Sequence, residues 1–212
     1  MLICKICKNE TNNFNDKYNE VTYSHCRVCG FISKDEQHLV DSKRENEEYN
    51  RHNNNIDDHG YTKRFYELIN DYIRPNTNEI DVLEFGSGPS PVFYEILLLE
   101  GYKAEHYDPY YYKNDSVFKK KYSIITSVEV VEHFYDPLFE FSRLKTLLKE
   151  GGYLVIMTNF RTMNIEAFND WWYKRDITHV SFYNEDTMKY LSDHLGFKIV
   201  QTNHKNIIVF QK

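Results

Sequence analysis

The chain has 212 residues and a formal net charge of -6 at pH 7, a length that suits one sizeable α/β domain with a small appendage. This acidic balance argues against a protein that works along nucleic acid backbones, so nucleic acid is not expected as a partner. No apolar run approaches the ~20 residues of a membrane span and no signal peptide precedes the first cysteine, which together predict a cytoplasmic protein.

The four cysteines form two C-x-x-C pairs near the N-terminus, at Cys4, Cys7, Cys26 and Cys29. Two such pairs at this separation favour a tetrahedral Cys4 zinc site. Disulfides are a poor alternative in a cytoplasmic protein, and a redox motif would need only one reactive pair near a βαβ unit. Because four thiolates leave no position for water or substrate, we predict a structural zinc ribbon over residues 1–35.

The next segment turns polar, and its charged and asparagine-rich runs up to residue 58 are typical of a solvated helix and loop. Apolar residues then repeat at helical spacing until Pro75, which predicts a helix packed on the core. That stripe consists of Tyr61, Phe65, Leu68, Ile69, Tyr72 and Ile73. Residues 36–78 therefore form a connector that leads into the main domain.

Residues 81–91 read DVLEFGSGPSP, an apolar strand that stops at two closely spaced glycines. Gly86 and Gly88 allow the backbone to turn sharply and to approach a ligand without an intervening Cβ. Ser90 is expected to cap a helix whose first position is Pro91, and the N-terminus of that helix attracts anionic groups. A dinucleotide fingerprint, G-x-G-x-x-G, does not fit, because position 91 is proline.

The spacing E-x-G-x-G, at Glu84, Gly86 and Gly88, resembles the first motif of class I S-adenosylmethionine-dependent methyltransferases. The resemblance implies that this loop, including Phe85 and Ser87, binds the methionine part of the cofactor. A third glycine, frequent in that family, is missing here.

The segment ahead of the first strand commonly lies over the cofactor in this fold. A subset of the family that begins with a zinc ribbon has a similar Tyr-x-x-His and Gly-Tyr pattern. This likeness implies that His52 or Tyr61 contacts the cofactor.

A second strand is predicted from Tyr102 to Tyr107, ending at Asp108. An acid at this strand end, about twenty residues beyond the glycines, can accept hydrogen bonds from both ribose hydroxyls. The alternative is an ordinary Asp-Pro turn. Before Tyr122 only Asp115 is available to read the adenine, so either the third strand is reduced or adenine is held by backbone and apolar contacts.

Residues 122–137 contain a strand followed by EVVEHFYDP, whose final Asp-Pro pair predicts the start of a helix, and a further strand follows over 153–158. The run E-x-x-E-H-x-x-D-P resembles the corresponding motif of small-molecule methyltransferases. It implies that Val128 and Glu129 contact the cofactor. His133 is a candidate general base at the carboxyl edge of the sheet, and Glu132 a candidate to orient it.

The dense aromatic segment over residues 171–183 contains D-x-T-H-x-x-F, which is similar to a segment that faces the active site in the same enzymes. This likeness makes His179 a second candidate base. Alternatively, the tryptophans cover the sheet edge and Arg175 and Asp176 form a surface pair. Asn184 is expected to cap a helix that stops at Gly196, before an antiparallel closing pair of strands.

The sequence thus predicts an α/β fold with a Rossmann-like, mostly parallel sheet over residues 79–212. The function that the resemblance implies is methyl transfer from S-adenosylmethionine to a small-molecule acceptor. Two alternatives are an RNA or protein methyltransferase that uses the ribbon for recognition, and a non-catalytic adaptor.

Overall fold

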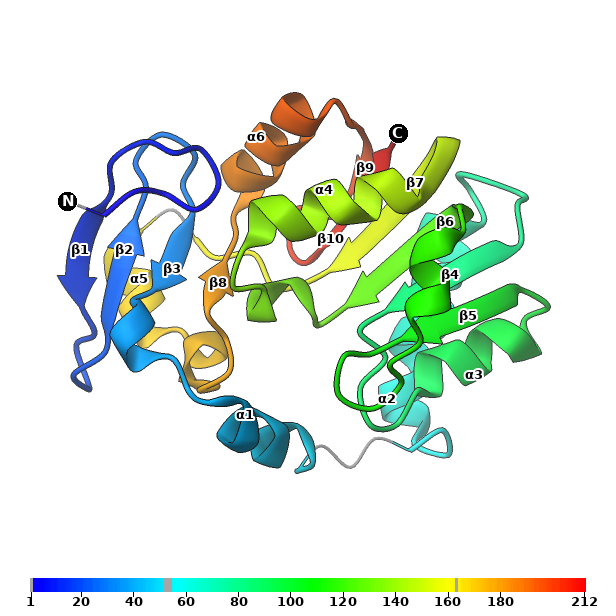
Figure 1. Ribbon diagram of the computed structural model, residues 1–212, viewed down its shortest axis with the longest axis horizontal. Helices are drawn as coiled ribbons and strands as arrows, with labels where there is room; N and C mark the ends of the chain where they lie inside the picture. The colour runs from blue at the N-terminus through cyan, green and yellow to red at the C-terminus, as the bar shows by residue number, and fades with distance from the viewer. Residues whose placement is uncertain (1, 52–54, 163) are drawn as a thin grey trace.

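The computed structural model describes residues 2–51, 55–162 and 164–212, which form two sheets joined by short helices (Figure 1). The larger sheet has six strands in the order β5-β4-β6-β7-β10-β9. Their bounds are β4 Asp81–Phe85, β5 Lys103–Tyr107, β6 Tyr122–Val128, β7 Leu148–Met157, β9 Lys198–Thr202 and β10 Ile207–Gln211. β4 runs parallel to β5 and β6, and β6 to β7, whereas β10 is antiparallel to β7 and β9. The predicted mostly parallel sheet with an antiparallel closing strand is confirmed.

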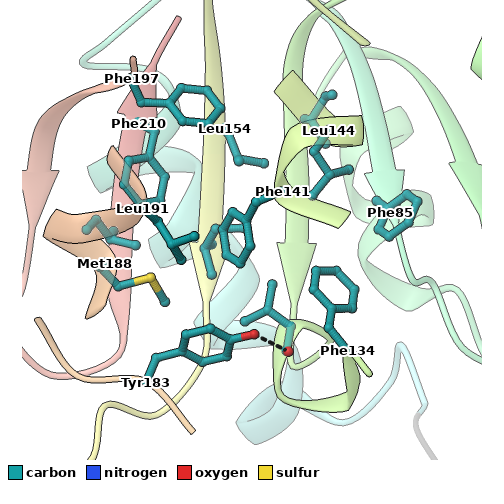
Figure 2. Packing of buried hydrophobic residues seen from close by; sticks show 14 of the residues in the cluster. Phe85, Phe134, Phe141, Leu144, Leu154, Tyr183, Met188, Leu191, Phe197 and Phe210 are labelled. Atoms are coloured by element: carbon teal, nitrogen blue, oxygen red, sulfur yellow. Dashed lines mark hydrogen bonds between the residues drawn. The ribbon is translucent and has the colours of Figure 1, made fainter. Parts of the chain in front are cut away.

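Helices cover both faces of this sheet, because its central strands are apolar on both sides. One face carries α2 (His59–Leu68), its π-helical continuation η2 (Ile69–Ile73) and α3 (Val92–Leu99). The other carries α4 (Pro137–Leu147) and α6 (Glu185–Leu195). Figure 2 shows this second core, where the Phe141 ring of α4 packs against Phe134, Tyr183 and Phe210. The Tyr183 hydroxyl donates to the Val131 carbonyl at 2.8 Å.

At the N-termini of helices, the predicted capping residues are found in two of three places. The side chains of Asp136 and Asn184 cap α4 and α6, and Gly196 ends α6 in the left-handed conformation. The predicted cap at Ser90 is wrong. Pro91 is not helical and itself occupies the capping position, so α3 begins at Val92 without a side-chain cap.

The described chain between β5 and β6 forms a short 3-10 helix, η3 (Asp115–Lys119), instead of a strand of the sheet. This agrees with a reduced third strand. The other short helices are η1 (Glu36–His38), α1 (Ser42–Tyr49), η4 (Val131–His133), α5 (Ile165–Asp170) and η5 (Trp172–Arg175). No helix in the described ranges is long and apolar enough to span a bilayer.

The smaller sheet contains the ribbon strands β1 (Asn12–Asn15), β2 (Thr22–His25) and β3 (Ile32–Lys34), followed by β8 (Ser181–Phe182). β8 comes from the C-terminal third of the chain, and Figure 1 shows it between β3 and α4. A separate apolar cluster joins ribbon residues Tyr23 and Ile32 to Phe168, Tyr173 and Phe182. The ribbon is therefore packed into the fold through its own sheet.

Candidate functional site

A cavity of about 1230 Å³ lies at the carboxyl ends of the parallel strands and is bordered by α1 and α2. Ligands of open α/β sheets bind at this edge. Most predicted site residues line the cavity, namely Tyr61, Glu84, Phe85, Gly86, Ser87, Gly88, Asp108, Val128, Glu129, His133 and His179. His52 falls outside the described residues.

The glycine loop has the backbone conformation that glycine permits. Gly86 and Gly88 have φ angles of +87° and +66°, which L side chains rarely adopt. A Cβ on Gly86 would lie 2.4 Å from a methyl group of Val130, so this position has no space for a side chain. A Cβ on Gly88 would meet nothing within 4 Å, and its backbone is open towards the cavity.

Asp108 connects the end of β5 to this loop. Its Oδ2 accepts a hydrogen bond from the Gly88 N–H at 2.9 Å, while Oδ1 accepts from the Tyr110 and Tyr111 N–H groups at 2.8 and 3.1 Å. A carboxylate offers about four acceptor sites, so roughly one remains on Oδ2. Asp115 on η3 does not belong to the cavity-lining residues.

Glu84 lies at the end of β4 and is 5% exposed. Its Oε2 is buried and has no hydrogen-bond partner among the described residues. Burial raises the pKa of this carboxyl to about 8. A buried carboxyl with one unpartnered oxygen at the cavity favours a ligand with a positive charge or a hydrogen-bond donor.

Glu129 and Glu132 follow β6 and share one tyrosine. The Tyr173 hydroxyl lies 2.9 Å from a Glu129 carboxylate oxygen and also contacts Glu132, which accepts a further bond from the Thr158 hydroxyl at 2.9 Å. Glu129 has a φ of +54°, a strained conformation that turns the chain at the cavity edge. Burial, reinforced by Glu129, raises the pKa of Glu132 well above its usual value. Glu132 is fully buried behind the cavity wall, whereas Glu129 lines the cavity.

The two histidines lie close to Tyr173 and Glu132, and their ring centroids are 4.8 Å apart. His133 Nδ1 donates to the Thr178 carbonyl at 3.1 Å, and His179 Nδ1 donates to the Tyr173 carbonyl at 2.7 Å. Because a carbonyl oxygen only accepts, these bonds place the proton of each neutral ring on Nδ1. Burial, assisted by the neighbouring His179, lowers the pKa of His133 to about 3.

The charged helix α1 is largely solvent-exposed, as expected, but one of its carboxylates is buried. Glu45 is only 5% exposed and accepts hydrogen bonds from the hydroxyls of Tyr49, Tyr110 and Tyr135. The Tyr49 ring also lies 5.3 Å from the His133 ring. The four-residue spacing of Glu45 and Tyr49 on a helix was the only sequence signal for this cluster.

The aromatic segment 171–183 lies partly against the ribbon sheet and partly at the cavity. Trp171 packs against Phe182 of the ribbon sheet, whereas Trp172, Tyr173 and Asp176 line the cavity. Asp176 is thus part of the cavity, and its Oδ2 lies 3.7 Å from His179 Nε2. The sequence did not single out Tyr173, although it contacts both glutamates of the preceding motif.

The four cysteines of the ribbon are buried, and their sulfur atoms all lie within 4.8 Å of one another. The Sγ atoms of Cys4 and Cys29 are 3.6 Å apart, and those of Cys7 and Cys26 are 3.2 Å apart. A disulfide would require about 2.05 Å, whereas a tetrahedron with Zn–S bonds of about 2.3 Å separates its sulfur atoms by about 3.8 Å. The geometry suits a metal site made from one cysteine pair on each knuckle.

Comparison with known proteins identifies the same region of the chain. A family model described as a methyltransferase domain matches residues 40–202, and no curated protein matches the sequence significantly. A SAM-dependent methyltransferase from Archaeoglobus fulgidus superposes with a TM-score of 0.52 and 19% identity, over 72% of this chain and 98% of that one. Magnesium protoporphyrin IX methyltransferase from Synechocystis PCC 6803, solved with bound SAH, superposes with a TM-score of 0.50 and 14% identity, over 82% and 89%. At such identities the structural likeness shows a shared fold.

Proposed function

The chain belongs to the methyltransferase-domain family of class I enzymes, and on that premise we propose that it methylates a small-molecule acceptor with S-adenosylmethionine as donor. The observation that carries this proposal is the convergence of the glycine loop, Asp108 and two histidines on one cavity. Its volume of about 1230 Å³ exceeds that of most single-ligand pockets, which supports room for a donor and an acceptor together.

The residues at the cavity floor fit the cofactor. The Gly88 backbone is open to a ligand, and Glu84 presents a buried carboxyl oxygen that lacks a partner among the described residues. Asp108 can accept a hydrogen bond from one ribose hydroxyl and keep its three hydrogen bonds from backbone N–H groups. Tyr61 borders the same space from α2. When bound, S-adenosylmethionine supplies a methyl group on a sulfonium, already activated for in-line displacement.

The chain's remaining task is to align the acceptor and to remove its proton. Correct alignment alone supplies on the order of 7–11 kcal/mol of the barrier. His133 and His179 carry their protons on Nδ1, so each neutral ring has its basic lone pair on Nε2. We assign the general base to His133, with His179 as second candidate. Glu132 acts from behind the wall by holding Tyr173.

We further propose one structural zinc ion bound by Cys4, Cys7, Cys26 and Cys29. Four thiolates fill a tetrahedral shell, so the ion would stabilise the ribbon and have no open position for substrate. Such sites contribute roughly 10–16 kcal/mol of apparent binding energy, which a short ribbon needs because its own core is small.

Calorimetric titration of the zinc-loaded protein with S-adenosylmethionine and S-adenosylhomocysteine tests the proposal. Both are expected to bind one site, and Asp108→Ala is expected to abolish binding while Asp115→Ala, away from the cavity, leaves it unchanged. A labelled-methyl screen over small acceptors and RNA then separates the small-molecule function from the macromolecular one. Absence of binding to the folded wild-type protein would favour the adaptor instead.

A further inference from the structure

The segment that carries His179 is held between the ribbon and the motif that follows β6. On one side β8 pairs with β3, with Ser181 opposite Ser33. On the other side the Val180 N–H donates to the Glu132 carbonyl at 2.9 Å. The ribbon therefore backs this wall of the cavity through backbone hydrogen bonds.

Lys34, the last residue of β3, binds the backbone on both sides of Thr178 and His179. Its N–H donates to the Val180 carbonyl at 2.9 Å, and its ammonium donates to the Ile177 carbonyl at 2.7 Å. The residue is only 4% exposed. Burial lowers the pKa of Lys34 to about 8, so the fold keeps an ammonium here in spite of its desolvation cost.

A second buried lysine, in the short helix η5 ahead of this segment, binds the ribbon. Lys174 forms an ion pair with Asp16, and the two side chains are 4% and 0% exposed. Farther along the chain, the Thr187 hydroxyl donates to the carbonyl of Cys29 at 2.8 Å. The ribbon thus contacts the C-terminal third of the chain before, within and after the segment that carries His179.

We propose that Lys34 is a positioning residue of the active site. Through its hydrogen bonds to the carbonyls of Ile177 and Val180, Lys34 fixes the backbone from which His179 reaches the cavity. The ribbon thereby supports the part of the cavity wall that carries His179. The role of His179 rests on the proposed methyltransferase function. The positioning itself is a property of the protein without ligand and is tested separately.

The first test is hydrogen exchange on the zinc-loaded full chain without cofactor. Lys34→Met should make the amides of residues 178–182 exchange about tenfold faster, while β4 and β6 keep their protection. The affinity for S-adenosylmethionine should stay within twofold of wild type, because Lys34 does not belong to the cavity-lining residues. Lys17→Met is the matched control, since the exposed Lys17 side chain of the ribbon pairs with Asp170 of α5 and contacts the Tyr18 ring at the surface.

The second test is the imidazole spectrum of His179 from long-range ¹H–¹⁵N correlation. In the wild type, Nδ1 should carry the proton of the neutral ring. In Lys34→Met we expect a mixture of tautomers, and Lys34→Arg, which retains a donor, should restore the wild-type spectrum. A purely structural lysine would not move this signature selectively.

Two results would overturn the proposal: unchanged exchange and tautomer in Lys34→Met, or a uniform loss of protection across both sheets. If Lys34→Met fails to fold, Lys34→Gln replaces it in both tests, with the same expected results. The glutamine amide is too short to reach the Ile177 carbonyl. Failure of the wild-type protein to bind S-adenosylmethionine would instead remove the proposed function and leave the exchange result valid.

Discussion

His133 is neutral throughout the physiological pH range, because burial and the neighbouring His179 lower its pKa to about 3. Its Nδ1 proton is committed to the Thr178 carbonyl, which leaves Nε2 as the basic atom. A base with so low a pKa in the ligand-free protein works only if the acceptor, once bound, stabilises the imidazolium.

We therefore expect His133→Ala to keep its affinity for S-adenosylmethionine and to lose about 10²–10⁴-fold in turnover. Calorimetry gives the affinity, and labelled-methyl transfer gives the rate. His204→Ala is the control, because the His204 side chain is 70% exposed and pairs with Glu185 at the surface. Normal turnover in His133→Ala would remove this residue from the mechanism.

The buried carboxyl of Glu84 makes the ligand-free protein sensitive to pH. Its pKa rises from an ordinary value of 4.5 to about 8 on folding, so the folded state binds the proton more tightly than the unfolded state. This stabilising contribution is fully present below pH 4.5 and is lost as the pH rises to about 8. The stability of the cofactor-free protein should therefore fall over that interval.

In Glu84→Gln we expect the free energy of unfolding to fall less with pH than in wild type. The stability of the variant relative to wild type should therefore be higher at pH 8.5 than at pH 5, by a few kcal/mol at most. Urea unfolding without cofactor at the two pH values measures it. Glu150→Gln, a change at an 88% exposed side chain, should have no such effect. Parallel pH curves for wild type and Glu84→Gln would contradict the assignment.

Among the elements, α1 is the one whose sequence was least informative. Its charges predict a solvated helix, yet Glu45 is buried beneath three tyrosine hydroxyls from α1, the loop after β5 and the loop after β6. This cluster joins the connector to both halves of the cavity. We infer that α1 helps to retain the cofactor.

Glu45→Ala should weaken S-adenosylmethionine binding about tenfold, or ~1.4 kcal/mol, mainly through faster release. Stopped-flow release and hydrogen exchange over residues 42–49 are the measurements. Glu47→Ala changes an exposed position of the same helix and should leave both unaltered. An unchanged release rate in Glu45→Ala would show that α1 packs there without retaining a ligand.

The strands and most helices of the main sheet could be predicted because their apolar runs, glycines and capping residues act locally. The position of the glycine loop at the ligand cavity could be predicted from the same local signals. Local signals could not reveal that Tyr173 bridges two glutamates, or that Lys34 and Glu45 are buried, because those arrangements depend on segments far apart in the sequence. The error at Ser90 has a local cause: Pro91 took the capping position itself.

At the scale of the whole molecule, the ribbon is tied to the C-terminal third of the chain by the pairing of β3 with β8, the Asp16–Lys174 ion pair and the Thr187–Cys29 hydrogen bond. A separable domain would lack such contacts. Cys26→Ser should remove one zinc ion per chain, as measured by elemental analysis, and lower the melting temperature. Hydrogen exchange should rise first over the ribbon strands and β8, and later over β4 and β6. His25→Ala, next to the ligand, should keep its zinc. Equal stability without zinc would contradict a structural role for the ion.

The pairing of β8 with β3 also concerns how the protein is made. Ser33 leaves the ribosome long before Ser181, its partner in the sheet, so a nascent ribbon must wait for its fourth strand while most of the chain is still being synthesised. During that interval Ile32 and Tyr23 lack the apolar cover that Phe168 and Phe182 later supply. If the proposed zinc ion binds early, it would protect the newborn segment from misfolding, and cells short of zinc should then accumulate aggregated rather than merely inactive protein.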